Sequence, residues 1–504
     1  MLSYIDYILD RITMYRVILY YLIGILIVAA VLGSFNLLPY SPLEIAGATA
    51  VLVIVSGGAN YLFSKVYNAP TNLESAYITA LILACILPPV HSVHDLPLLV
   101  WAAGLAMASK YILAIRNKHL FNPAAIAVLL TAFWLNLSAT WWVGTPAMLP
   151  VVLIGGILMI RKLRRYDMVF SFFAAALVTS GVLTILAGND LFTVLQELIL
   201  RSPLLFFAFV MLTEPLTSPP TNFKQILFGG LVGILFAPQI HFGSLYFTPE
   251  MALVIGNLFS YVISPKVKER LVLAGAANLT PDIVEFSFRP SRPFRFRPGQ
   301  YMEFTLPHAG IDSRGNRRYF TLASSPTEES LRLGIKFYPN SSSFKRNLIA
   351  LQPNQWLMAG QLAGDFTLPD NPEEKLVFIA GGIGVTPFRS MLKYLTDTGA
   401  RRTVTLLYMN KSAEEIAYAD IFHEAQAKTG ARIVYTLTDT APPGWSGRIG
   451  RIDERMVREE VPDFADRTFY ISGPHAMVVG IEQTLRNLGV GANRIKKDFF
   501  PGLT

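Results

Sequence analysis

The chain changes character near Ser264, and this change limits what it can fold into more than any other feature. Before Ser264, long apolar runs follow one another with short polar breaks, and after it short hydrophobic patterns alternate with Gly and Pro. A helix that crosses a bilayer needs about 20 apolar residues, whereas short alternating runs are typical of strands with one face in water. We therefore expect a polytopic α-helical membrane domain over residues 1–265, followed by soluble domains.

The composition agrees with contact to lipid. Only 15% of the 504 residues are charged, against about 25% in soluble domains. The net charge of +8 does not indicate a nucleic-acid partner, because much of the excess Lys and Arg lies in short loops between apolar runs, which is a topology signal. The single cysteine, Cys85, excludes an internal disulfide and an iron–sulfur cluster, which needs about four thiolates.

Ten apolar runs are candidates for membrane helices, and the eighth is short. The first lacks a small-residue cleavage site, so we expect a retained helix and not a signal peptide. The runs cover residues 16–35, 43–63, 74–90, 97–115, 122–141, 146–161, 168–188, 201–213, 225–240 and 245–263.

Basic residues collect in the loops on one side of these runs. The opposite loops carry almost none, apart from Arg201. By the positive-inside rule, we expect a multi-pass protein of the cytoplasmic membrane. Both termini and the soluble domains would then lie in the cytoplasm. The basic residues in these loops are Lys65, Arg116, Lys118, Arg161, Lys162, Arg164, Arg165, Lys224, Lys266, Lys268 and Arg270.

Three polar segments interrupt this half at the cytoplasmic ends of expected helices: residues 72–80, 118–125 and 213–221. Proline and polar side chains at membrane depth are tolerated where protein or a cavity covers the freed backbone groups. Asn122-Pro123 alone is a common helix start. Three such segments on one side indicate a shared polar pocket.

Two of these segments carry a family resemblance. Phe121-Asn122-Pro123-Ala124 and Thr213-Glu214-Pro215-Leu216-Thr217-Ser218-Pro219 resemble motifs in the flavin-carrying membrane subunits of Rnf complexes (the D subunit) and of Na⁺-translocating NADH:quinone oxidoreductase (the B subunit). The resemblance covers roughly residues 15–264. It implies ten helices with a second flavin, FMN or riboflavin, among them. The implied flavin-binding residues are Asn122, Pro123, Thr213, Glu214, Thr217 and Ser218.

One departure from that family concerns how the flavin is held. Members usually carry an extracytoplasmic Asp-x-x-Ser-Gly-Ala-Thr loop whose Thr is esterified to FMN. The nearest string here, residues 43–49, ends in Gly-Ala-Thr but lacks the Asp and the Ser. We therefore expect a noncovalent membrane flavin.

The soluble half shows two successive patterns. Residues 266–370 contain short strands broken by Gly and Pro, which predicts a small antiparallel barrel. Over residues 371–504 strands alternate with helices, which predicts a doubly wound parallel sheet. Its expected strands are residues 376–380, 404–408, 432–437 and 468–472.

A glycine-rich turn, Gly381-Gly382-Ile383-Gly384-Val385-Thr386-Pro387, joins the first of these strands to a helix. Glycines let backbone amides approach a pyrophosphate, and the helix N-terminus favours its negative charge. The strand–turn–helix context makes this a candidate dinucleotide-binding turn.

Five further motifs stand in register with this turn. They are Arg318-Tyr319-Phe320-Thr321-Leu322-Ala323-Ser324, Ser341-Ser342-Ser343-Phe344-Lys345, Gly364-Asp365-Phe366, Ser472-Gly473-Pro474 and Asp498-Phe499-Phe500-Pro501-Gly502. Together they resemble the ferredoxin–NADP reductase family over roughly residues 266–504. The resemblance implies an FAD-binding barrel followed by an NAD(P)H-binding domain.

The family roles carry over by position. Arg318 would pair with the FAD pyrophosphate, because the fixed fork of a guanidinium suits phosphate oxygens, and Thr321 would hydrogen-bond near flavin N5. Phe320 stands where members usually have Tyr, and Ser472 where many have Cys near the nicotinamide. The implied catalytic residues are Thr321, Ser472 and Phe500. The implied cofactor-binding residues are Arg318, Tyr319, Phe320, Thr321, Ser324, Ser342, Ser343, Phe344, Gly364, Gly381, Gly382, Gly384, Thr386, Pro387, Lys411, Gly473 and Pro474.

The choice between NADH and NADPH depends on the end of the second parallel strand. An acid there would favour the free ribose hydroxyls of NADH. The segment there, Tyr408-Met409-Asn410-Lys411, contains no acid and one cation. Lys411 therefore slightly favours NADPH.

The expected function is a membrane oxidoreductase that passes electrons from NAD(P)H through FAD to the membrane flavin, and on to a quinone or an extracytoplasmic redox partner. A haem-containing enzyme of the ferric reductase or NADPH oxidase kind would need paired transmembrane histidines, and no run carries a pair. A redox-coupled cation transporter would need buried acids, for which Glu74 and Glu214 are the candidates.

Overall fold

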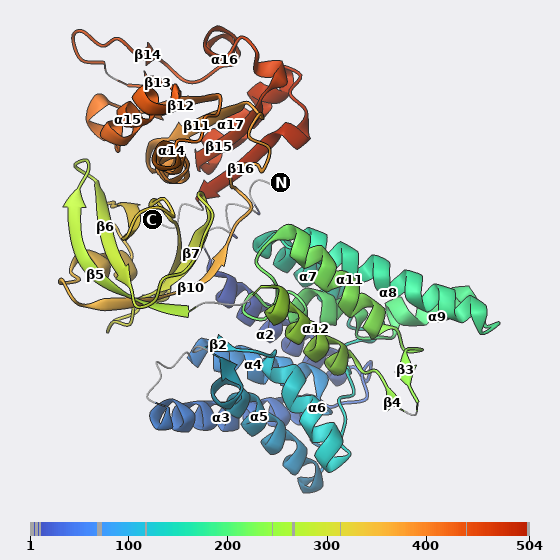
Figure 1. Cartoon of the computed structure of the whole chain (residues 1–504). Helices are drawn as coiled ribbons and strands as arrows, with labels where there is room; N and C mark the ends of the chain where they lie inside the picture. The colour runs from blue at the N-terminus through green and yellow to red at the C-terminus, as the bar shows by residue number, and fades with distance from the viewer. Residues whose placement is uncertain are drawn as a thin grey trace. The chain divides into compact units, whose positions relative to one another are not determined.

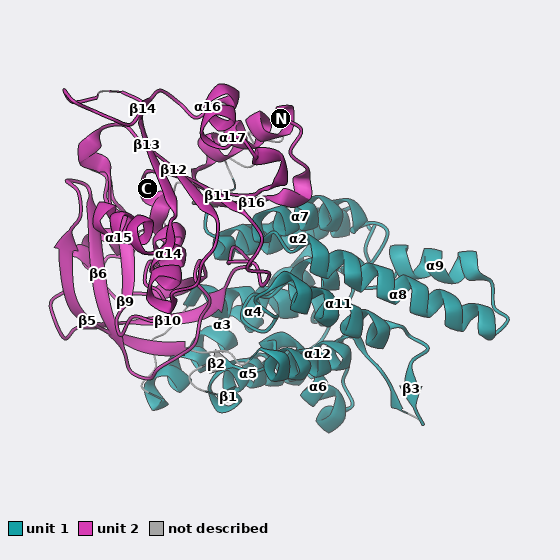
Figure 2. Cartoon of the chain, turned by 45° about the horizontal axis from the view of Figure 1, so that its top comes forward, with its two compact units in different colours: residues 1–266 teal, residues 267–504 magenta. Residues whose placement is uncertain are grey.

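The computed structural model describes residues 12–67, 73–115, 118–243, 245–264, 268–312, 314–439 and 441–500, together with Ile5 and Leu9. Its contacts divide the chain into two compact units, unit 1 over residues 1–266 and unit 2 over residues 267–504 (Figure 2). The division falls where the hydrophobic pattern of the sequence changes.

Unit 1 is built almost entirely of helices (Figure 1). Two short strand pairs, β1–β2 (Ala114–Ile115 with Lys118–His119) and β3–β4 (His241–Phe242 with Leu245–Tyr246), join neighbouring helices. The helices are α2 (Met14–Ser34), α3 (Pro42–Val66), α4 (Leu73–Ile86), η1 (Val93–Asp95), α5 (Leu96–Ile112), α6 (Pro123–Leu135), α7 (Leu149–Leu163), α8 (Tyr166–Leu186), α9 (Leu191–Leu200), α10 (Leu204–Phe206), the π-helix η2 (Phe207–Met211), α11 (Asn222–Phe236) and α12 (Pro249–Ile263).

Every one of the ten apolar runs contains helical residues, and three helices are long and apolar enough to cross a membrane by themselves. They are α2, α3 and α8. The pair formed by α9 and the α10–η2 segment, bent by 56°, would make a fourth span, and α4, α6, α11 and α12 are shorter apolar helices. Membrane helices are therefore confirmed in the described part of the chain, and the number ten stays a prediction.

The fifth run differs from its prediction, because its helix ends at Leu135 and not near residue 141. Asn136 adopts a left-handed cap with φ of 56°. The tryptophans that follow turn inward: the Trp142 Nε1 donates to the carbonyl of Ala84 at 2.9 Å, and the Trp141 amide donates to that of Ile86 at 2.9 Å. These donors satisfy carbonyls at the end of α4, which a helix leaves without partners.

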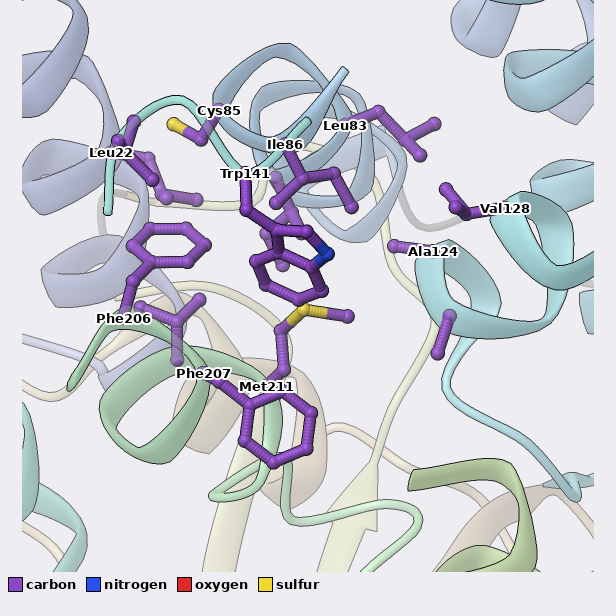
Figure 3. Packing of buried hydrophobic residues seen from close by; sticks show 14 of the residues in the cluster. Leu22, Leu83, Cys85, Ile86, Ala124, Val128, Trp141, Phe206, Phe207 and Met211 are labelled. Atoms are coloured by element: carbon purple, nitrogen blue, oxygen red, sulfur yellow. The ribbon is translucent and has the colours of Figure 1, made fainter. Parts of the chain in front are cut away.

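Apolar side chains from most of these helices form one core in unit 1. Figure 3 shows Trp141 in this core, close to Phe206, Phe207 and Met211. The indole Nε1 of Trp141 donates to the buried Glu250 carboxylate at 2.7 Å. The core therefore includes loop residues such as Trp141 as well as helical residues.

Unit 2 begins with a six-stranded antiparallel sheet in the order β8-β7-β10-β5-β6-β9. Two residues after β8, the Ala323 amide donates to the carbonyl of Arg332 in β9, which brings the two ends of the sheet together. The sheet encloses its own apolar core, as a small barrel does. Its elements are β5 (Lys268–Asn278), β6 (Ile283–Pro290), β7 (Tyr301–Thr305), β8 (Arg317–Thr321), β9 (Leu331–Lys336), α13 (Ser343–Ile349) and β10 (Trp356–Ala363).

The second sheet of unit 2 is parallel throughout, in the order β14-β13-β12-β11-β15-β16. The chain moves outward from β11 first on one side and then on the other, so the carboxyl end of β11 is a topological switch point, where such sheets bind ligands. The strands are β11 (Leu376–Gly381), β12 (Val404–Asn410), β13 (Arg432–Leu437), β14 (Arg448–Ile449), β15 (Thr468–Pro474) and β16 (Ile495–Phe500). The helices are η3 (Gly382–Val385), α14 (Thr386–Thr398), η4 (Ala413–Glu415), α15 (Ala419–Thr429), α16 (Glu454–Glu460), η5 (Phe464–Asp466), α17 (His475–Asn487) and η6 (Ala492–Arg494).

The four predicted parallel strands are present as β11, β12, β13 and β15. The sequence reading missed β14 and β16. β14 has only two residues, and the charged Ile495-Lys496-Lys497-Asp498 stretch of β16 lacks the apolar run of a buried strand because β16 has only one neighbour.

Candidate functional site

Arg318 is the centre of a buried cationic cluster at the end of the barrel. Its Nη1 donates to the carbonyl of Arg314 at 2.7 Å, while Nε and Nη2 have no partner among the described residues. Burial lowers the pKa of Arg318 to about 10. Burial, with the charges of Arg318 and Arg314, lowers the pKa of Lys345 to about 8. Buried cations with unfilled donors are the arrangement that an anion such as a diphosphate satisfies.

The serines predicted to bind the same diphosphate differ in what they contact. The Ser342 hydroxyl caps α13 by accepting from the Lys345 amide. The Ser343 amide donates to Asp312 at 2.7 Å, and the Ser343 Oγ lies 3.0 Å from Nε2 of His308. Asp312 and His308 were missed in the sequence, since a carboxylate and an imidazole in a loop carry no pattern. They fix Ser343 beside the cluster.

The strand β8 places its other predicted residues on two faces. Phe320 packs inward against Phe304 and Phe344, with ring centroids 5.8 and 5.9 Å apart. On the opposite face the Tyr319 hydroxyl donates to Glu303 at 3.0 Å, and Thr321 is buried. β8 therefore joins the cationic cluster to the position predicted for flavin N5.

Two further predicted residues have structural contacts. The Ser324 hydroxyl accepts from the Arg332 amide at 3.1 Å. Gly364 has φ of +112°, and a Cβ there would lie 3.1 Å from the ring of Tyr301. A side chain at position 364 would therefore need the Tyr301 ring to move.

The glycine-rich turn lies at the switch point of the parallel sheet. Gly382 has φ of +52°. A Cβ on Gly384 would lie 2.5 Å from the carbonyl oxygen of Ser472, and one on Gly381 would lie 2.2 Å from the sulfur of Met477. The turn and the 472–474 segment are thus packed backbone to backbone.

Ser472 adds a polar group beside the turn. It is fully buried, and its hydroxyl has no partner among the described residues. Thr386 and Pro387 open α14 behind the turn, and Gly473 and Pro474 end β15. A tight glycine turn at a helix start with an unsatisfied hydroxyl beside it fits a nicotinamide dinucleotide.

The end of β12 carries Lys411, which is exposed. The Asp439 amide, just after β13, donates to the Lys411 carbonyl at 3.1 Å. The sequence motif at β12 showed a cation and no acid. The structure brings an acid from the next strand to the same edge.

In unit 1 the three polar segments meet around one cavity of about 60 Å³. Ser75 and Thr79 come from the first segment, Asn122 and Pro123 from the second, and Glu214 from the third. The lining residues are Met14, Tyr15, Ile18, Ser75, Ile78, Thr79, Ile82, Asn122, Pro123, Ala124, Met159, Leu163, Val210, Thr213, Glu214, Pro215 and Leu216.

Thr217 and Ser218 do not line the cavity, but their hydroxyls form hydrogen bonds with Glu214. The Thr217 hydroxyl donates to the Glu214 Oε2 at 3.0 Å, and the Ser218 hydroxyl donates to the Glu214 carbonyl at 2.6 Å. At about 60 Å³ the cavity is well below the roughly 300–1,000 Å³ of pockets that enclose drug-sized ligands. It does not enclose a whole flavin ring.

Several predicted residues fall outside the described part of the chain. These are Asn72, Arg116, Lys266, Pro501 and Gly502, together with the side chains of Lys118, Phe499 and Phe500.

Comparison with known proteins gives separate matches for the two halves. A model described as NQR2, RnfD, RnfE family matches residues 143–272. One described as Oxidoreductase NAD-binding domain matches residues 378–483.

Each of the following proteins matches less than half of this chain. Ferredoxin–NADP reductase B of Sorangium cellulosum is 30% identical over 218 residues, which are 42% of this chain and 85% of the relative. The glycine betaine monooxygenase reductase subunit of Chromohalobacter salexigens is 27% identical over 231 residues, 44% of this chain and 61% of the relative, so the chain spans less than two thirds of that protein. Among solved structures, an Amycolatopsis cytochrome P450 reductase is 24% identical with a TM-score of 0.42, over 47% of this chain and 70% of that one.

The reductase relative is covered over most of its length, and the membrane-family match ends within the first strand of unit 2. The chain therefore belongs to the ferredoxin–NADP reductase family through its C-terminal half, which is fused to an N-terminal membrane domain of the NQR2, RnfD, RnfE kind.

Proposed function

We propose that the chain is a membrane oxidoreductase in which unit 2 takes electrons from NAD(P)H onto FAD and unit 1 carries them onward. The observation that supports this most is the pair of unsatisfied sites in unit 2: the cationic cluster at Arg318 and the glycine turn with the unpartnered Ser472 hydroxyl. FAD, when bound, accepts a hydride and releases electrons one at a time.

In this proposal, the residues of unit 2 bind FAD and the nicotinamide dinucleotide and orient them. Arg318 and Lys345 neutralise the FAD diphosphate, and Thr321 donates a hydrogen bond at flavin N5. The turn at Gly382 and Gly384 brings backbone amides to the dinucleotide. Lys411 offers a cation for a 2′-phosphate, and Asp439, just after β13, offers an acid for free ribose hydroxyls, so both NADPH and NADH are proposed as donors.

The second redox group is proposed for unit 1, at the cavity shared by the three polar segments. A noncovalent flavin, FMN or riboflavin, is the expectation from the membrane family. The cavity encloses only part of such a ring, so the rest would extend beyond it. Thr49 ends the string that is nearest to the family's covalent attachment loop. Its hydroxyl donates to the Ile45 carbonyl at 2.7 Å.

The terminal acceptor proposed is a quinone in the bilayer or an extracytoplasmic redox partner. The positive-inside pattern supports a multi-pass protein of the cytoplasmic membrane with both termini and unit 2 in the cytoplasm.

The test uses the whole chain purified in detergent. NAD(P)H oxidation is measured with ferricyanide, and the flavins released by acid precipitation are identified. We expect oxidation, FAD, and a second released flavin. Absence of oxidation would overturn the reductase assignment, and FAD alone would overturn the membrane flavin.

A further inference from the structure

Glu214 is the only carboxylate among the described residues that line the unit 1 cavity. Its Oε1 lies 3.4 Å from Nε2 of His119, and both side chains are largely shielded, with 21% and 11% of their surface exposed. Its Oε2 accepts from Thr217. A carboxylate on a cavity wall with an imidazole behind it is an arrangement that moves protons, because histidine titrates near neutral pH.

We propose, building on the function proposed above, that Glu214 and His119 deliver protons to the redox group that is reduced at this cavity. Glu214 is the group that reaches the ligand, and His119 resupplies its proton. A separation of 3.4 Å is long for a working hydrogen bond, but such contacts commonly shorten when the ligand binds.

A fixed cation also lies near Glu214, so the carboxylate passes each proton on and does not store it. Lys110 on α5 interacts electrostatically with the carboxylate, and its Nζ donates to the carbonyl and hydroxyl of Ser75 at 2.9 and 3.2 Å. Ser75 itself lines the cavity. The carboxylate is therefore flanked by one fixed cation and one group that can gain or lose charge.

Two more charged contacts lie on neighbouring elements. Arg16 on α2 pairs with Glu74 on α4 at 3.7 Å, and the Arg165 guanidinium, at the start of α8, donates to the Ser218 hydroxyl. Glu74 is thus occupied by its own cation. Glu214 both lines the cavity and contacts a histidine.

The proton balance is simple. A two-electron reduction of a planar ring forms two O–H or N–H bonds and takes up two protons. In each transfer the O–H bond of protonated Glu214 breaks as the bond to the ring forms. The Nε2–H bond of the His119 imidazolium then breaks to restore that O–H, and water reprotonates His119. The electrons come from NAD(P)H through FAD in unit 2.

The cavity identifies the class of ligand by its size and lining. Most of the lining side chains are apolar, and the polar ones include Ser75, Thr79, Asn122 and Glu214. Such a lining suits a flat aromatic ring with polar atoms at an edge. A cavity of about 60 Å³ receives that edge, where protonation occurs. A quinone and a flavin share this chemistry.

The test compares two acceptors in the full-length protein. Glu214→Gln and His119→Gln each remove one proton carrier while keeping size and hydrogen bonding. Ferricyanide takes electrons without protons and reports on unit 2, whereas ubiquinone-1 needs protons. We expect quinone reduction to fall about 100-fold, in the range of general acid catalysis, with ferricyanide reduction within twofold of wild type.

Matched controls come from the same unit. His91 forms a comparable pair with Glu44 at 2.6 Å, but both residues lie outside the cavity lining. His91→Gln and the exposed Glu197→Gln should leave both activities unchanged. The solvent isotope effect on quinone reduction separates proton delivery from a structural role. We expect this effect in wild type and an altered effect in Glu214→Gln.

The outcomes are distinguishable. Quinone reduction unchanged in both Glu214→Gln and His119→Gln overturns this inference and leaves the proposed function intact. If acid extraction shows a second flavin, loss of reduction of that flavin in the variants assigns the pair to it, and normal flavin reduction with slow quinone reduction assigns the pair to the quinone. Wild-type protein that reduces ferricyanide but neither quinone nor a second flavin overturns the function and the inference together.

Discussion

Lys345 is the residue whose charge should set the pH dependence of FAD binding. Its pKa is lowered to about 8, so in the free protein it loses its proton above that pH. Only the protonated amine attracts a diphosphate, so binding raises the pKa again. FAD affinity should therefore be constant below about pH 7 and fall above pH 8, by up to about tenfold per unit.

Fluorescence titration of flavin-free protein between pH 6 and 10 measures this effect. Lys345→Arg keeps its charge over the whole range and should give a flat profile to pH 10. A wild-type profile as flat as that of the Arg variant would show that Lys345 does not sense the diphosphate.

Thr321 carries the second prediction at this scale. The hydroxyl proposed to bond flavin N5 is removed in Thr321→Ala and kept in Thr321→Ser. A hydrogen bond contributes about 1 kcal/mol, so flavin reduction by NAD(P)H in stopped flow should slow about fivefold in the Ala variant only. Equal rates in all three proteins would remove this role from Thr321.

Sequence reasoning at the residue scale pointed to residues that the structure places together where a motif exists, and it missed residues whose contacts are made at a distance. The Arg318 motif led to the cationic cluster, and the Thr213-Glu214-Pro215 motif led to the cavity. His308, Asp312 and Asp439 were missed because their roles depend on which loops meet, which a linear pattern does not encode.

Among the elements, helix α14 is tied directly to the turn between β8 and β9. The Arg389 guanidinium forms a two-pronged pair with Glu328 and donates to the Ala323 carbonyl at 3.0 Å. The Ser390 hydroxyl donates to the Ser324 carbonyl at 2.6 Å. The helix behind the nucleotide turn is thus bound to the residues that directly follow Thr321-Leu322.

Breaking this tie should weaken unit 2 strongly. Arg389→Met removes one of the two guanidinium partners of the shielded Glu328, which keeps Arg332 at 3.1 Å, so the loss should stay below the roughly 3–5 kcal/mol of a fully stranded buried charge. Combining it with Glu328→Gln should recover part of the loss, because the carboxylate that loses a partner is then neutral. Urea unfolding of the single and double variants measures the difference. If the double variant loses more free energy of unfolding than the two single variants lose together, the pairing is contradicted.

Gly384 tests the contact between the glycine turn and β15. A Cβ there would collide with the backbone of Ser472 and Gly473, so Gly384→Ala should raise the KM for NAD(P)H at least tenfold while FAD stays bound. Gly480→Ala is the control, because its Cβ meets open space inside α17. Normal kinetics in Gly384→Ala would show that the turn can move aside.

Element boundaries followed the local pattern when the helix or strand was long. The parallel strands were found because buried strands read as continuous apolar runs. The end of α6 was misplaced because Trp141 and Trp142 look like helix residues in sequence, whereas in the structure they satisfy the last carbonyls of α4. The short helix α9 was hidden between two stronger apolar runs.

For the whole molecule, the separate cores of the two units predict that unit 2 folds alone. Residues 268–504 expressed by themselves should bind FAD and reduce ferricyanide at a rate within about threefold of the full chain, and should not reduce ubiquinone-1. Circular dichroism and the two assays measure this. Insoluble or flavin-free protein would mean that unit 1 is needed for folding.

Whole-molecule organisation was the most predictable level, because lipid and water select opposite compositions and the change near Ser264 is abrupt. The number of membrane crossings was less accessible. Several helices in unit 1 are shorter than a bilayer is thick, and hydropathy runs do not show where a helix bends.

The π-helix η2 has a consequence for insertions and deletions. Over Phe207–Met211 the chain accommodates one more residue per turn than an α-helix would, as shown by the bond from the Leu212 amide to the Phe207 carbonyl. Removing a single residue there would restore α-helical winding and leave the flanking residues close to their present orientation, whereas removing one from a regular α-helix rotates everything that follows by about 100°. Glu214 would then stay on the cavity wall, so a one-residue deletion within η2 should be far less damaging than replacing the carboxylate itself.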